Sequence, residues 1–193
     1  MIYAKKTAMF LCIVLMSSFL LSGCNLIKSE NTASMDKEFF IDYYNVSFTA
    51  TQEWSQTDQD NFDLQLTNGE AYFSVMTYYT IDLPVGDTPE NIYAWQNEDL
   101  FSRRENVETV EDERIIISDG KIITATMFSA ERDGKKNYYY SCLVQLGNNE
   151  DVFSWIIVTA LPSYMQKNKD VFLDIMKTME YVEDKEAEPI NVL

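Results

Sequence analysis

The sequence predicts an α+β domain in which two helices pack against an antiparallel sheet of about six strands. Between residues 107 and 161, four strand-like runs are separated by short turn sequences, among them Asp119-Gly120 and Asp133-Gly134, a pattern typical of an antiparallel meander. Around residues 88–103 and 165–181, apolar residues instead recur at helical spacing. Because the apolar face of each helix needs a surface to cover, we expect both helices to lie on the sheet.

The first residues of the chain are expected to lie outside this domain. Lys5 and Lys6 precede an apolar stretch that is shorter than the roughly 20 residues of a membrane-spanning helix. Positive charge, a short apolar run and small residues before a cleavage point are typical of a signal peptide, here residues 1–23. Residues 24–37 are small and polar without apolar periodicity, which predicts a flexible tether.

The signal segment ends in the sequence Leu21-Ser22-Gly23-Cys24. These four residues resemble the lipobox of bacterial lipoproteins, in which the cysteine receives a lipid and becomes the first residue of the mature chain. The resemblance implies acyl chains of the palmitate type on Cys24 and a position on the extracytoplasmic face of the cell membrane. Two acyl chains anchor a protein stably where one would not. The alternative is an ordinary secretory signal, or an uncleaved anchor, with a chance cysteine at this position.

The single domain is expected at residues 38–182, and its first strands carry clear signals. Val46, Phe48 and Ala50 alternate with polar residues, as in a half-buried strand. A hairpin is expected to join residues 63–66 to residues 70–79, because the Asn-Gly pair between them suits a type I′ turn with two residues at positive φ.

The first helix is expected from Thr88 to about Arg103. Thr88 can cap it, the proline that follows suits the first helical position, and the acid after that favours the first turn. Three of its apolar residues are expected to face the sheet: Ile92, Trp95 and Leu100.

The meander follows, with strands expected at residues 107–117, 121–130, 137–146 and 152–161. The last helix is expected at about residues 165–181. One of its faces carries a set of apolar residues at helical spacing: Val171, Phe172, Ile175, Met176 and Met179. Residues 183–193 form an acidic tail.

The order of these elements resembles the Mog1/PsbP-like fold. The resemblance covers most of residues 38–182 and is carried by the element order and by the stretch from Val46-Ser47-Phe48 to Trp54. Proteins with this fold include extrinsic photosystem subunits, a nuclear-transport factor and many bacterial lipoproteins. The resemblance implies a non-enzymatic interaction domain, and it transfers no site residue to this chain.

The chain is strongly acidic, with 31 acidic and 15 basic residues and a formal net charge of −16. Loss of residues 1–23 would remove two lysines and no acid, which makes the charge more negative still. Such a chain is repelled by nucleic acids and by anionic lipid head groups, so neither is an expected partner. A solvated acidic surface is the favoured interpretation, and a cationic ligand is the alternative.

The chain lacks the residues that several kinds of catalysis and cofactor binding require. The chain has no histidine, which removes the usual general bases and histidine-built zinc sites. No glycine-rich phosphate loop is present, so we expect no cofactor and no catalytic residue. Of the three cysteines, Cys12 would leave with the signal peptide and Cys24 would carry lipid. Cys142, which falls among apolar strand residues, is expected to be a buried, inert thiol.

Two groups of acids leave alternatives open. Asp58, Asp60 and Asp63 resemble a calcium loop, but the string lacks the oxygen ligand and the glycine that an EF-hand needs, so only a looser divalent-cation site remains possible. The other group comprises four acids: Glu108, Glu111, Asp112 and Glu113. They could belong to a carboxylate pair of a cell-wall glycoside hydrolase. A charged edge strand that resists aggregation fits them better.

The tyrosines are the most suggestive feature that remains. Seven of them are adjacent in pairs or a triplet: Tyr43, Tyr44, Tyr78, Tyr79, Tyr138, Tyr139 and Tyr140. Neighbouring residues on a strand point to opposite faces, so some rings should be exposed and could bind a partner. The alternative is that tyrosine is simply favoured in strands. The sequence therefore predicts a membrane-anchored, non-catalytic interaction module for a basic protein or peptide, for example a cationic antimicrobial peptide.

Overall fold

The computed structural model describes residues 34–58 and 61–183. The predicted signal peptide, Cys24 and most of the predicted tether lie outside these residues, as do Asp60 and nearly all of the acidic tail. In order, the described elements are β1 (Lys37–Ile41), η1 (Asp42–Tyr44), β2 (Val46–Ala50), β3 (Ser55–Gln56), β4 (Leu64–Thr67), β5 (Ala71–Tyr79), η2 (Thr80–Asp82), α2 (Pro89–Ser102), β6 (Glu105–Ser118), β7 (Lys121–Arg132), β8 (Lys135–Gln145), β9 (Val152–Ala160), α3 (Pro162–Lys177) and β10 (Glu180–Tyr181).

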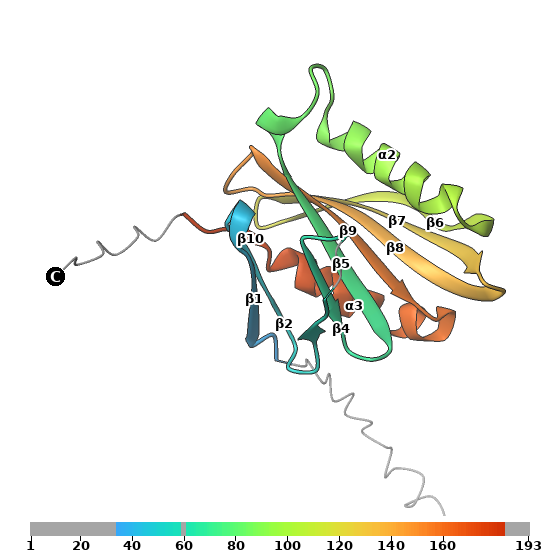
Figure 1. Ribbon diagram of the computed structural model, residues 1–193. Coiled ribbons are helices and arrows are strands. Elements are labelled where there is room, and N and C mark those ends of the chain that lie inside the picture. The colour runs from blue at the N-terminus through green and yellow to red at the C-terminus, as the bar shows by residue number, and fades with distance from the viewer. Residues whose placement is uncertain (1–33, 59–60, 184–193) are drawn as a thin grey trace, which may run out of the picture. The chain divides into compact units, whose positions relative to one another are not determined.

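Seven strands form one antiparallel sheet in the order β3-β4-β5-β9-β8-β7-β6 (Figure 1). The predicted meander supplies one half of it, since β6 to β9 follow one another in the chain and pair in turn. β9 then pairs along its whole length with β5. Nearly every residue of β9 is buried, because a central strand with both faces covered has no solvent side. The predicted α+β class is confirmed.

A second sheet of three strands, in the order β1-β2-β10, was not expected. The predicted strand around Phe48 lies in this sheet, as β2, rather than in the large one. β1 was missed because its adjacent Phe39 and Phe40 hide the alternation, and β10 was missed because two residues carry no periodicity. β10 also shortens the last helix, which begins at Pro162 and ends at Lys177, before the predicted end. There the Thr178 hydroxyl donates to the Ile175 carbonyl at 2.7 Å and accepts from the Thr49 amide at 2.9 Å.

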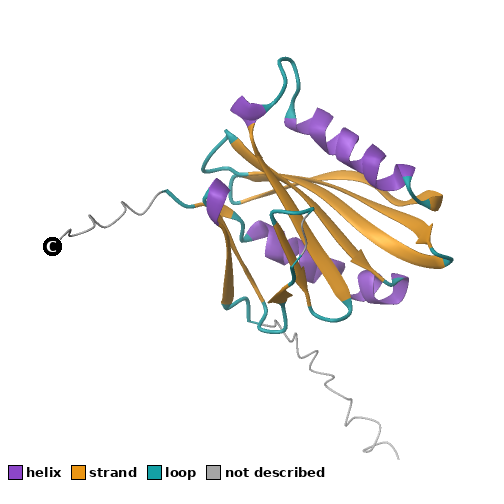
Figure 2. Ribbon diagram, viewed as in Figure 1, coloured by secondary structure: helices purple, strands orange, loops and turns teal. Residues whose placement is uncertain are grey.

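The larger core fills the face of the seven-stranded sheet that α3 and the three-stranded sheet cover (Figure 2). Trp54 and Phe172 are fully buried there with their rings edge to face, 6.1 Å apart, and Phe73 packs against the same indole. The predicted apolar face of the last helix contributes Phe172, Ile175, Met176 and Met179 to this core.

The opposite face of the sheet has a smaller core beneath α2. Its buried members are Tyr93, Ala130, Tyr139, Leu143, Phe153, Trp155 and Ile157. Trp95 is 60% exposed, so the expectation that it faces the sheet is wrong. The helix instead turns Tyr93 and Gln96 inward, where Tyr93 bonds to the buried Thr126 and Gln96 bonds to the half-buried Tyr78. Apolar periodicity cannot reveal these polar contacts.

One hairpin turn, between β4 and β5, differs from the predicted type. The turn between β4 and β5 has positive φ only at Gly69, so the predicted type I′ turn is wrong. The Asn68 side-chain oxygen instead accepts the backbone N–H groups of Glu70 and Ala71, which builds a longer loop. The Asp119-Gly120 turn, in contrast, has both residues at positive φ, as a two-residue type I′ hairpin requires.

Candidate functional site

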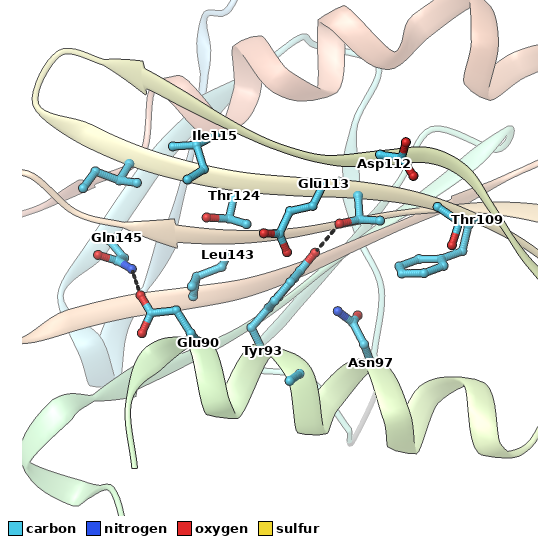
Figure 3. A pocket seen from close by; sticks show the side chains of 14 residues that line it. Glu90, Tyr93, Asn97, Thr109, Asp112, Glu113, Ile115, Thr124, Leu143 and Gln145 are labelled. Carbon is cyan, nitrogen blue, oxygen red and sulfur yellow. Dashed lines mark hydrogen bonds between the residues drawn. The ribbon is translucent and has the colours of Figure 1, made fainter. Parts of the chain in front are cut away.

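A groove of about 610 Å³ lies between α2 and the strands β6, β7 and β8 (Figure 3). It exists because α2 packs on β8 and β9 and leaves the outer strands of this sheet face without a covering helix. Its floor is mainly apolar and includes Ile115, Ile122, Phe128 and Leu143.

The inner wall of the groove is one face of α2. The Thr88 hydroxyl caps the helix by accepting the Asn91 backbone N–H at 3.3 Å, and proline occupies the first turn. This start of the helix places Glu90, Tyr93 and Asn97 on one face, because residues three and four apart lie on the same side of a helix. Figure 3 shows all three side chains rising from α2 toward the sheet.

Hydrogen bonds fix this wall to the sheet. The Tyr93 hydroxyl contacts Thr126 Oγ1 at 3.1 Å and donates toward the Ser141 carbonyl at 3.3 Å. Burial raises the pKa of Tyr93, so the phenol stays protonated at neutral pH. The Ser141 hydroxyl donates to Asn97 Oδ1 at 2.5 Å and accepts the Trp155 indole N–H at 3.1 Å. The wall is therefore held in place before any ligand arrives, which lowers the entropic cost of binding.

Glu90 carries a charge at the entrance to the groove. Partial burial raises its pKa, but hydrogen bonds from its own backbone N–H, from Thr88 and from Gln145 outweigh burial, so the pKa is lower than usual. Gln145 Nε2 donates to the carboxylate at 2.7 Å. The general acid of a glycoside hydrolase needs a raised pKa, which is the reverse of what Glu90 shows.

The outer wall of the groove is β6. The side chains of its four predicted acids, Glu108, Glu111, Asp112 and Glu113, do not all point in the same direction. Asp112 and Glu113 line the groove, and Figure 3 shows Glu113 directed toward the hydroxyl end of Tyr93. Glu111 turns to the other face and forms an ion pair with Lys169 of α3, while Glu108 pairs with Lys136 at 3.4 Å.

The irregular register of β6 against β7 accounts for this separation, since extra residues on one strand redirect the side chains that follow. The predicted charged edge strand is confirmed, because β6 is the last strand of the sheet. The four acids do not form a single carboxylate cluster.

The charge of the groove has one sign. Among the described residues that line it, three are acidic, namely Glu90, Asp112 and Glu113, and none is lysine or arginine. Carboxylates beside an apolar floor suit a ligand with a cationic group and an apolar body. Sequence reasoning missed Glu90, Tyr93, Asn97 and the isoleucines, because only the packing of α2 brings them opposite β6.

The predicted tyrosine site does not line this groove. Tyr43, Tyr44 and Tyr79 come together at the junction of η1 and the end of β5, with ring centroids 4.8 to 6.5 Å apart. Tyr43 is 75% exposed, so the expectation of an exposed ring is met there. Burial, with Asp63 as the next cause, raises the pKa of Tyr44 to about 12.

The other predicted tyrosines are mostly internal. Tyr78 stacks on Phe153 and its hydroxyl accepts from Gln96 at 2.5 Å. Tyr138 is half-buried, and both Tyr139 and Tyr140 are buried, on opposite faces of β8. The triplet therefore adds no fully exposed ring to that of Tyr43, because both faces of β8 are covered at this point.

The suggested cation site is divided between described and undescribed residues. Asp58 is exposed, Asp63 accepts the Thr77 backbone N–H at 2.6 Å, and Asp60 lies outside the described residues. Within residues 34–58 and 61–183, no three side chains of histidine, cysteine, aspartate or glutamate are grouped as metal ligands.

Cys142 is fully buried in the larger core, and burial raises the pKa of its thiol. This matches the prediction of a buried thiol.

No helix in the described part of the chain is long and apolar enough to cross a membrane.

Comparison with known proteins identifies the fold. No protein-family model and no curated protein sequence matches the chain. Among solved structures, cyanobacterial PsbP (CyanoP) from Synechocystis is similar with a TM-score of 0.56 and 9% identity, over 76% of this chain and 92% of that one. The Ran-binding protein Mog1p of Saccharomyces cerevisiae has a TM-score of 0.52 and 13% identity, over 77% and 97%.

A third similar structure is LpqN of Mycobacterium tuberculosis, which is described as involved in cell envelope biogenesis. It has a TM-score of 0.51 and 10% identity, over 70% of this chain and 82% of that one. At these identities the similarity shows the fold alone. The chain therefore has the Mog1/PsbP-like fold that the element order predicted.

Proposed function

We propose that this protein is a lipoprotein of the extracytoplasmic membrane face whose groove binds a cationic peptide, or a basic segment of a partner protein, without catalysis. Lipid on Cys24 would hold the domain at the membrane. The groove would be the binding site, in place of the tyrosines that the sequence first suggested.

The observation that carries this proposal is the composition of the groove. Glu90 and Glu113 approach it from opposite walls, Asp112 lies at its rim, and the floor between them is apolar. Charge of one sign in a concave site concentrates counter-charged ligands and accelerates their association. The apolar floor adds affinity that does not depend on salt.

The anchor and the acidity support each other in this proposal. A chain with a net charge of −16 is repelled by anionic head groups and needs a covalent lipid to remain at such a surface. Cationic peptides accumulate at the same surface. An anchored acidic domain would meet them there at a raised effective concentration, as an immunity lipoprotein requires.

Binding is tested with two cationic probes, the extended peptide acetyl-Lys-Thr-Val-Thr-Val-Thr-Lys-amide and an amphipathic helical peptide of lysine and leucine. We expect at least one to bind, with a Kd that rises with salt, and we expect the extended peptide with glutamate in place of lysine not to bind. The double variant Glu90→Gln with Glu113→Gln should weaken binding roughly tenfold, about 1.4 kcal/mol.

The matched control for binding is Glu53→Gln with Glu180→Gln, which changes the net charge equally at exposed positions outside the groove. If the control pair weakens binding as much as the groove pair, the acidity acts without a site. If neither probe binds in a salt-dependent way, the proposed ligand is wrong.

Anchoring is tested separately in bacterial cells. We expect the wild-type chain to incorporate labelled palmitate and to sediment with membranes, whereas Cys24→Ala should lose the label. Cys12→Ala is the matched control and should keep it. Equal labelling of wild type and Cys24→Ala would remove the lipoprotein assignment while leaving the groove proposal intact.

A further inference from the structure

We infer that the cationic peptide of the proposed function binds as an extended strand that adds to the open edge of β6 at residues 114–118, beside the groove, with alternate side chains on the face that carries Ile115 and Glu113. This inference rests on the proposed function and deepens it, because it states the conformation of the peptide, its pattern of side chains and the backbone groups that hold it.

The open edge is divided into a protected part and an unprotected part. β6 is the last strand of the seven-stranded sheet, and no described strand lies beyond it. Its register against β7 shifts three times before Arg114 and is then regular from Arg114 to Ser118. Shifts of this kind twist an edge and hinder pairing with another chain, so only the last part of β6 is suited to receive a strand.

Side-chain charge changes at the same point. The five acids of β6 all lie at or before Glu113, and after Arg114 the sequence continues Ile-Ile-Ile-Ser. Ile115 is 66% exposed and Ile117 is 75% exposed. Charged residues protect an edge strand from pairing, and here that protection is missing where the strand is most regular.

The hairpin turn determines which backbone groups face outward. The two-residue turn at 119–120 is flanked by the pair Ser118 and Lys121. Such a closing pair is hydrogen-bonded between the strands, and bonded pairs alternate with non-bonded ones along an antiparallel ladder. Residues 114, 116 and 118 therefore bond to β7. Ile115 and Ile117 turn their backbone N–H and C=O groups to the open edge.

Ile115 lines the groove, and Ile117 lies on the same face of β6 beyond the residues that line it. Ile115 pairs with Thr124 and Ile117 with Ile122, and Ile115, Ile122 and Thr124 all line the groove. A strand added at this edge would place alternate side chains on this face. Two apolar residues at i and i+2 would lie beside Ile115 and Ile117, and the next residue on that face would approach Glu113.

The occupant is therefore an extended peptide with apolar residues at i and i+2 and a basic residue two positions further along. The probe acetyl-Lys-Thr-Val-Thr-Val-Thr-Lys-amide has this pattern in either direction. Main-chain hydrogen bonds would supply affinity, and the lysine near Glu113 would supply selectivity for a cation.

The first test replaces one outward backbone donor. Ile117→Pro removes an N–H that faces the open edge and leaves the bonds to β7 in place, a position at which edge strands tolerate proline. We expect this variant to bind the extended probe at least tenfold more weakly. Ile117→Val keeps the N–H with a smaller apolar side chain and should bind within about threefold of wild type. Circular dichroism shows whether the proline variant remains folded.

The second test changes only the peptide and cannot disturb the fold. One probe is N-methylated at both valines and another at the two threonines that precede them. A strand paired on one side uses alternate amides, so one methylated probe should lose at least tenfold in affinity and the other should bind as the parent does. Loss with the valine set indicates antiparallel addition, and loss with the threonine set indicates parallel addition.

The outcomes separate this inference from the proposed function. If both methylated probes bind as the parent does and Ile117→Pro has no effect, strand addition is overturned. The groove proposal still stands in that case if Glu90→Gln with Glu113→Gln weakens binding or if the helical probe is the one that binds.

Discussion

The two faces of the seven-stranded sheet are covered very differently. On one face, α3 and the three-stranded sheet enclose a continuous core that draws buried side chains from β2, β4, β5, β7, β8 and β9. On the other face, α2 covers β8 and β9 and leaves a groove along β6 and β7. The complete face mainly stabilises the fold, and the incomplete face is available for binding.

A single strand serves both faces, because its side chains alternate between them. In β7, Ile123, Ala125 and Met127 are buried in the larger core, whereas Ile122 and Thr124 line the groove. Substitutions one residue apart on the same strand should therefore have different effects, on stability in one case and on binding in the other.

The largest expected difference comes from one substitution made on each face. Ile175→Ala in α3 removes a fully buried side chain from the larger core and should lower the free energy of unfolding by about 2–5 kcal/mol. Ile115→Ala removes an exposed side chain and should cost less than about 1 kcal/mol. Urea unfolding followed by circular dichroism measures both. Similar losses would show that β6 is structurally more important than its exposure indicates.

A smaller effect is expected where α2 is fixed to the sheet. Tyr93→Phe removes the hydroxyl that contacts Thr126 and Ser141 and should cost about 1–2 kcal/mol. Amide hydrogen exchange should become faster in α2 and stay unchanged in α3. Tyr72→Phe, at a half-exposed position, is the control and should change neither. Unchanged exchange in α2 would mean that apolar contacts alone hold the helix.

The effect that is smallest at neutral pH is a dependence of stability on alkaline pH. Burial is the main cause that raises the pKa of Tyr140 to about 12, and a hydrogen bond from Arg114 only partly offsets it. A folded-state pKa above the unfolded value of 10.0 means that this stability is complete below pH 10 and is lost as the pH rises through about 12.

Tyr140→Phe should therefore make the fall of Tm between pH 10 and pH 12 shallower. Met127→Ala, in the same core without a titrating group, should lower Tm by a similar amount at each pH. An identical pH slope for wild type and Tyr140→Phe would remove Tyr140 as its source.

The sequence predicted the meander and the start of α2 well, because their signals are local. The strand-like runs of β7 to β9, the turns between them and the Thr-Pro-Glu start of the helix depend on neighbouring residues alone. The three-stranded sheet was missed for the opposite reason. β2 pairs with β1 on one side and with β10 on the other. The residues that join β10 to β2 lie more than 130 positions apart in the chain, for example Ser47 and Glu180.

The candidate site was harder to predict than the fold. The tyrosines stood out in the sequence because they are adjacent, yet the structure distributes them between two cores and one exposed cluster. The acids of β6 indicated correctly that it is an edge strand. Their separation, with Asp112 and Glu113 in the groove and Glu111 on the opposite face, depends on register shifts that no local pattern records.

By itself, the sequence determined the α+β class, the acidic surface, the absence of histidine chemistry and the lipobox-like sequence at Cys24. These properties follow from composition and from short-range patterns. Only the tertiary structure decided that α2 covers β8 and β9 on one sheet face and that Glu90 and Glu113 lie on opposite walls of one groove. That arrangement arises from long-range packing, where the distance between two side chains is independent of their separation along the chain.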